Sequence, residues 1–219
     1  LQFLRNASLF YARNNKLSIG LAKANKGFEY VNKTQGAETL LAFYQLLNLS
    51  EVYLQAGQYQ KSLDFSNKGL AVVEKQIINS SHKLDSIKTE LKKPRAILLK
   101  AEAEYHLLKN KNVENLTALL KQLENGVSIL ERRKTIFRDS KDIGLLMDDH
   151  MDLLNFIKKI TLDLFNLTKD QGYIERLMDL QESGTYTRIR SRLDKSDSIQ
   201  FAHVPYEVQQ KEKKLKASI

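Results

Sequence analysis

The chain has 219 residues, 42% of them hydrophobic and 28% charged, and a formal net charge of +9, which is an ordinary composition for a globular protein. It contains no cysteine, which excludes disulfides, thiolate metal sites and cysteine nucleophiles from this sequence. Two prolines and nine glycines are too few for the frequent turns of an all-β fold. No apolar run approaches the roughly 18 residues of a membrane span, and no signal peptide is visible.

The first part of the chain contains an internal repeat. Residues 1–33 align without a gap with residues 43–75, and ten of the 33 positions are identical. In the second copy Leu46, Leu49 and Tyr53 follow the spacing i, i+3 and i+7, which places them on one face of a helix. A short turn and a second run with helical spacing follow in each copy. Each copy therefore predicts two helices joined by a short turn.

Small residues recur on the second helix of each copy. They are Gly20 and Gly27 in the first copy and Ser62 and Gly69 in the second. Small side chains let two helices approach closely, so that larger side chains can fill the holes opposite them. We expect these four residues to lie where the two helices of a hairpin, or neighbouring hairpins, come closest.

The pattern resembles the tetratricopeptide repeat, in which a large apolar residue, a Leu, a small residue and a Tyr mark the first helix. The matching residues in the second copy are Leu46, Leu49, Ser50, Tyr53, Gly57, Tyr59, Ser62 and Gly69. Two features depart from that repeat: Glu74 stands where Pro usually ends it, and the period is 42 instead of 34. The resemblance implies an all-α fold, an α-α superhelix of hairpins whose concave face is lined by the first helix of each pair.

The rest of the chain keeps helical spacing but loses the repeat. Pro94 suits the first turn of a helix, an insertion is expected around residues 80–82, and residues 143–167 predict one long amphipathic helix. We expect three tetratricopeptide-like hairpins, a long fourth hairpin, and a linker with a terminal helix, in the ranges 1–36, 37–79, 80–137, 138–195 and 196–219.

The N-terminal region is basic. Residues 1–36 hold six Lys and Arg residues against Glu29 alone, a balance of +5, and residues 75–100 are rich in Lys. Such a balance suits an acidic partner or nucleic acid, although solvated helix faces also carry it. Aromatic residues among the charges would favour base stacking. Their spacing instead predicts core positions for Phe3, Phe10, Tyr11, Phe28 and Tyr30.

The last 47 residues resemble the end of the repeat region in bacterial CHAT proteins, where a caspase-like peptidase domain follows tetratricopeptide repeats. Glu182-Ser183 matches the first junction motif, but Gly184-Thr185 replaces its Lys-Ala; Val204-Pro205 and Glu212…Leu215 match the second. The resemblance implies a regulatory or sensor arm, with the peptidase after Ile219 and a ribonucleoprotein as one possible partner. Because both ends lie within helical patterns, we expect a piece of a longer protein.

No catalytic pattern stands out. The four histidines, at 82, 106, 150 and 203, are at least 24 residues apart, and neither HExxH nor a glycine-rich phosphate loop occurs. We therefore expect no enzyme activity, no metal and no cofactor in this segment, and no membrane partner. Absent disulfides suit a reducing compartment, so the expected location is cytoplasmic.

The tetratricopeptide pattern assigns certain positions of the first helices to the partner groove. The candidates in the first two hairpins are Arg5, Leu9, Arg13, Tyr44, Leu47, Glu51 and Gln55; the third hairpin offers Ala96, Leu99, Ala103 and His106. Arg5 and Arg13 suit a carboxylate or phosphate, and Tyr44 an aromatic anchor, but Leu47 could instead pack against the next repeat. We expect a scaffold that binds a protein or peptide, with nucleic-acid binding as the alternative.

Overall fold

The computed structural model describes residues 1–134 and 150–181, and all secondary structure in these two ranges is helical. The predicted all-α class is therefore confirmed. The helices are α1 (Gln2–Arg13), α2 (Leu17–Thr34), α3 (Leu40–Gln55), α4 (Tyr59–Ile78), α5 (Lys83–Glu90), α6 (Lys93–Leu107), α7 (Val113–Lys134) and α9 (Met151–Thr168), and residues 172–181 form a further helix.

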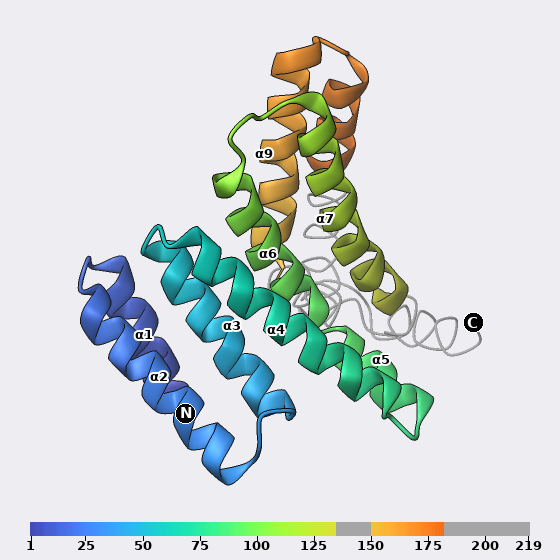
Figure 1. Ribbon diagram of the computed structural model, residues 1–219. Helices are drawn as coiled ribbons and strands as arrows, with labels where there is room; N and C mark the ends of the chain where they lie inside the picture. Colours follow the sequence, from blue (N-terminus) through green and yellow to red (C-terminus); the bar gives the residue numbers. More distant parts are fainter. Residues whose placement is uncertain (135–149, 182–219) are drawn as a thin grey trace, which may run out of the picture.

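The helices pair into hairpins that stack in chain order (Figure 1). Helices α1 and α2, α3 and α4, and α6 and α7 form antiparallel pairs. The second helix of each pair packs on the first helix of the next: α2 on α3, α4 on α6, and α7 on α9. The first helices α1, α3, α6 and α9 also contact one another in sequence. This repeated contact pattern is that of a helical repeat.

The helix ends follow local sequence signals. The Thr39 hydroxyl accepts a hydrogen bond from the Ala42 amide at 3.2 Å and caps the start of α3. Gly57 ends the hairpin turn after α3 with φ of +69°, a conformation that favours glycine. Pro94 lies in the first turn of α6, as predicted, where its missing N–H costs no helical bond.

Two features of the described helices were not expected from the sequence. The expected insertion around residues 80–82 is followed by a short helix, α5, which packs on α4. The prediction of one continuous helix over residues 143–167 is wrong, because His150 has non-helical backbone angles and α9 begins at Met151. Residues 143–149 and the expected terminal segment 196–219 lie outside the described residues.

Small residues lie where the helices are closest, as the sequence predicted. Gly20, Gly27, Ser62 and Gly69 are all buried. A Cβ atom on Gly20 would lie 2.8 Å from the carbonyl oxygen of Ser8 on α1. In the second hairpin the Ser62 carbonyl accepts a hydrogen bond of 2.9 Å from Ser50. The hairpins therefore close backbone against backbone, with room for nothing larger than a hydroxymethyl group.

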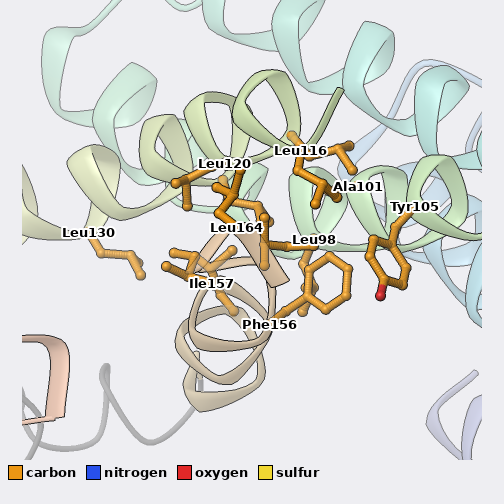
Figure 2. Close-up of a cluster of buried hydrophobic side chains, with 13 residues drawn as sticks. Leu98, Ala101, Tyr105, Leu116, Leu120, Leu130, Phe156, Ile157 and Leu164 are labelled. Atoms are coloured by element: carbon orange, nitrogen blue, oxygen red, sulfur yellow. The ribbon is translucent and has the colours of Figure 1, made fainter. Parts of the chain in front are cut away.

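Larger apolar residues fill four clusters among the described residues, and the smallest consists of Leu91, Ile97 and Ile129 with Leu70 of α4 packed against it. The largest lies between α6, α7 and α9 and contains Leu98, Leu116, Phe156, Ile157 and Leu164 (Figure 2). A second joins α3 and α4 to α6, and a third joins the first two hairpins. No hairpin buries its apolar residues by itself, because every cluster draws side chains from a neighbouring pair.

The expectation of core positions for the N-terminal aromatic residues is wrong for three of the five. Tyr11 and Phe28 are half-buried, but Phe3, Phe10 and Tyr30 are exposed. These three lie on the side of the first hairpin that faces away from α3 and α4, where no described helix covers them. The periodicity identified a helix face correctly, but it could not show whether a neighbour covers that face.

Gly20→Ala tests the close approach of α1 and α2. An added methyl group meets backbone atoms of α1, which cannot move aside, so we expect unfolding free energy to fall by about 2 kcal/mol. At an exposed helix position the same exchange is favourable by about 1 kcal/mol. The pair Asn25→Gly and Asn25→Ala, at an exposed position of α2, supplies that reference in urea denaturation. Equal effects at both positions would contradict the packing described.

Candidate binding face

The first helices α1, α3, α6 and α9 form one continuous surface, which we call the first-helix face. A chain of ion pairs crosses it. Glu51 on α3 binds Arg13 on α1, with 3.2 Å between Nη2 and Oε1, and Arg95 on α6, with 3.0 Å between Nη2 and Oε2. Arg95 in turn binds Asp152 on α9, with 3.2 Å between Nη1 and Oδ2. Four side chains of alternating charge thus connect all four first helices.

Glu51 is the buried member of this chain. Its side chain is only 6% exposed, whereas the arginine side chains are 60% and 31% exposed for Arg13 and Arg95. Burial would lower the pKa of Arg95, but the attraction and hydrogen bond of Glu51, with Asp152, more than offset it and raise that pKa. A buried carboxylate is tolerable here because both of its oxygens are bound by guanidinium groups.

A polar cleft of about 500 Å³ opens on this face beside the ion-pair chain. Its walls come from the end of α3, the start of α4, and from α6 and α9. Tyr59 and His106 stack in its wall with ring centroids 4.4 Å apart and nearly parallel planes. Gln55 and Asn155 contribute exposed amide groups. A cleft of this size, with a flat aromatic wall and amides that donate and accept, suits a short extended peptide segment.

Glu102 lies half-buried in the cleft. Burial is the main cause that raises its pKa, to about 7; Arg95 opposes the rise, Asp152 and Glu51 add to it, and Lys159 opposes it. Near neutral pH this carboxyl group therefore exists in both protonation states, and it can either donate or accept a hydrogen bond.

Two lysines lie over the ring of Tyr105, next to the cleft residue His106. Tyr105 donates a hydrogen bond of 2.7 Å to Asp163, and Lys111 and Lys159 lie over its ring at 3.9 and 4.4 Å from the centroid. Burial, followed by the two lysines, lowers the pKa of His106. The lowered pKa favours the neutral form of His106, which can both donate and accept a hydrogen bond. The lining of the cleft thus includes the carboxylates of Glu102 and Asp152 and the ammonium group of Lys159.

The predicted groove residues divide between this face and the core. Arg13, Glu51 and Gln55 belong to the ion-pair chain or the cleft. Leu47 is buried among residues of α4 and α6, so its side chain packs against the next hairpin.

Three further candidates are half-buried. Leu9 packs on the cluster between the first two hairpins, and Tyr44 packs on the cluster that includes Leu47, with Lys92 over its ring. Arg5 is half-buried on α1. These residues support the hairpins, and a partner would meet only part of each side chain.

The sequence missed the charged residues of α6 and α9. Ala96 and Ala103, which the repeat alignment assigned to the groove, are buried, and so is Leu99; of that set only His106 lines the cleft. The residues one position earlier, Arg95 and Glu102, reach the face instead. Helix α6 packs against α3, α4, α7 and α9, so only a narrow stripe of it stays open. Arg95 and Glu102 are seven residues apart, and this spacing could have indicated that the two charged residues share one side of α6.

A second hollow, of about 460 Å³, lies between α4 and the turn from α6 to α7. It is mainly apolar, with Leu63, Leu107 and Leu108 in its lining. Its polar side chains bind each other, because Gln122 donates to Glu104 at 3.2 Å. Asn115, which also lines the hollow, donates to the backbone carbonyl of Asn110 at 3.1 Å. The cleft on the first-helix face has more polar and charged side chains in its lining, so it is the stronger candidate site.

Two searches of the described residues gave no positive result. No group of three or more His, Asp or Glu side chains in residues 1–134 and 150–181 could hold a metal ion. No helix in the same part of the chain is long and apolar enough to cross a membrane.

Glu51→Gln tests the ion-pair chain. The amide keeps the size of the side chain but removes the charge that both arginines neutralise, so we expect unfolding free energy to fall by about 2 kcal/mol. Glu29→Gln, at an exposed position of α2, should change it by less than about 0.5 kcal/mol. Chemical denaturation of both variants measures the difference. Equal stability of both variants would mean that the chain of ion pairs contributes nothing.

Glu102→Gln tests the raised pKa of the cleft carboxyl. The folded chain binds more protons than the unfolded chain between the ordinary Glu pKa of 4.5 and the folded value of about 7. The stability that this group contributes below pH 4.5 is therefore lost as pH rises through 7. After allowance for partial exposure, we expect wild type to lose about 1–2 kcal/mol relative to Glu102→Gln between those limits. Glu29→Gln should keep the wild-type pH profile; a wild-type profile in Glu102→Gln would refute the assignment.

No model of a known protein family matches the chain, and no curated protein matches it either. The chain's own helices, ion pairs and cleft form an all-α helical repeat with a polar cleft on its first-helix face.

Proposed function

We propose that the chain is a protein-interaction scaffold that binds an extended segment of a partner protein along its first-helix face. The observation that supports this most is the polar cleft of about 500 Å³ beside the ion-pair chain. An extended peptide has unpaired backbone N–H and C=O groups, and a binding site must pair them. Gln55 and Asn155 are placed to do so, while Tyr59 and His106 offer a flat surface for a side chain.

The charges of the cleft favour a partner segment that carries both signs. Glu102 and Asp152 suit a basic side chain, and Lys159 suits an acidic one. Arg13 and Arg95 are less available, because Glu51 and Asp152 already bind them. Specificity would then come from the order of charges along the bound segment.

The same pairing argues against nucleic acid on this face. A phosphate backbone is bound by unpaired Lys and Arg side chains in a row. Here the arginines alternate with carboxylates, which would repel phosphates. Nucleic-acid binding therefore stays the second candidate function, supported by the exposed lysines of the first hairpin and the Lys-rich residues 75–100.

The proposal extends to the role of the scaffold through resemblance alone. Its hairpins resemble tetratricopeptide repeats, and the motifs at Glu182-Ser183 and Val204-Pro205 resemble the junction before the peptidase of bacterial CHAT proteins. Both motifs lie outside the described residues. On this proposal the scaffold acts as the regulatory arm of such a peptidase and has no catalytic activity of its own. A partner on the first-helix face would then control the attached domain.

A peptide library displayed on phage tests the binding function. Peptides selected on the 219-residue chain should bind it measurably in solution by fluorescence anisotropy. Asn155→Trp places a large ring in the cleft without disturbing the core, because Asn155 is exposed, and should weaken binding by at least about 10-fold.

Asn125→Trp is the matched control. Asn125 is exposed on α7, which does not line the cleft, so this variant should bind like wild type. Thermal melting of both variants checks that they fold. Failure to select any peptide, or equal binding by both variants, would refute the proposal for this face. Oligonucleotide binding that weakens steeply with salt would favour the second candidate function.

A further inference from the structure

The outer side of the first hairpin, which faces away from α3 and α4, is unusually apolar. Phe3 and Phe10 on α1 are 76% and 62% exposed, and Ile19 and Tyr30 on α2 are also exposed. We call these four residues the outer face. Phe3 and Phe10 lie seven residues apart, which places them on one side of α1. Tyr30 lies seven residues after Lys23, so these two residues share one side of α2. Large exposed apolar patches are uncommon on soluble monomers and mark contact surfaces.

The internal repeat shows what such a face does elsewhere in the same chain. At a shift of 42 residues, Phe3 corresponds to Gln45 and Phe10 corresponds to Val52, both on α3. These counterparts are 3% and 0% exposed. The same helix face is thus covered in the second hairpin and open in the first.

Helix α2 supplies the cover in the second hairpin. Val52 belongs to a cluster that includes Leu21, Ala24 and Phe28 of α2. A Cβ atom on Gly27 would lie 2.5 Å from the Gln45 side chain, so α2 passes directly over Gln45. The cover is therefore a second helix that presents small and apolar residues at helical spacing.

The positive charge around the outer face indicates which charge a covering helix should carry. Lys23 corresponds to Phe65 on α4, which packs in the same inter-hairpin cluster, so Lys23 belongs to the outer side. Lys26 follows on the same stripe. Residues 1–36 carry a balance of +5, so two copies of this hairpin would repel each other face to face. A cover with acidic side chains beside its apolar stripe would be attracted.

We propose that the outer face receives the second helix of another helical hairpin of the same construction, with acidic residues flanking its apolar stripe. The contact would continue the α2–α3 interface by one more step and bury Phe3 and Phe10 as Gln45 and Val52 are buried. The outer face is separate from the cleft, which α3, α4, α6 and α9 form, so the two proposals can fail independently.

The probe is an 18-residue fluorescein-labelled peptide with the α2 sequence and the changes Lys23→Glu, Lys26→Glu and Lys33→Glu. Anisotropy titration with the 219-residue chain at low salt should give saturable binding. The same peptide with its lysines retained should bind at least about 10-fold more weakly, because it repels the outer face. The double variant Phe3→Ser, Phe10→Ser of the chain should lose at least about 10-fold in affinity for the acidic peptide.

Ile78→Ser, at an 81% exposed position on α4, is the control and should bind the acidic peptide like wild type. Both variants should melt near the wild-type temperature, because they replace exposed side chains. No binding, or equal binding by the double variant, would overturn the proposal. Two other results would also overturn it: self-association in sedimentation that the double variant abolishes, and oligothymidylate binding that needs Phe3 and Phe10 while the peptide does not bind.

Discussion

The rest of the structure depends on the contact between the second helix of each hairpin and the first helix of the next. Each of the four apolar clusters of the described residues includes or is packed by side chains from two neighbouring hairpins. The two helices of each hairpin approach closely, because Gly20 and Ser62 are small. The larger side chains then point outward to the junctions between hairpins. Hydrophobic burial is the main favourable term in folding, and here it occurs between adjacent hairpins. Each hairpin therefore depends on its neighbours for stability.

Electrostatics follows the same geometry on the first-helix face. Because successive first helices lie side by side, one side chain from each can reach the next, and Arg13, Glu51, Arg95 and Asp152 alternate in sign across the row. The two arginines hold the buried carboxylate of Glu51 in place. Because they are already in ion pairs, they are less available to bind a phosphate. It also sets the field around the cleft, where Glu102 is held in a position that is costly to ionise.

The sequence predicted the repeating parts of the fold well and the unique parts poorly. The 42-residue repeat located the first two hairpins and the small residues at their closest contacts, because both leave a periodic trace. Register failed on α6, where Ala96 and Ala103 are buried and Arg95 and Glu102 reach the face, since packing on four sides decides which stripe stays open. Ion pairs between residues 38 to 57 positions apart have no local signature at all.

The position of a hairpin in the row also decides how firmly it is held. Among the described elements, the pair α3–α4 packs on a neighbouring pair at each side, whereas α1–α2 packs mainly on α3 at one side. Opening the first pair therefore breaks one junction, while opening the second breaks two. Because each hairpin contacts its neighbours in the row, unfolding is cooperative between adjacent hairpins. Opening the first hairpin exposes the least buried surface, so sub-global unfolding can begin there.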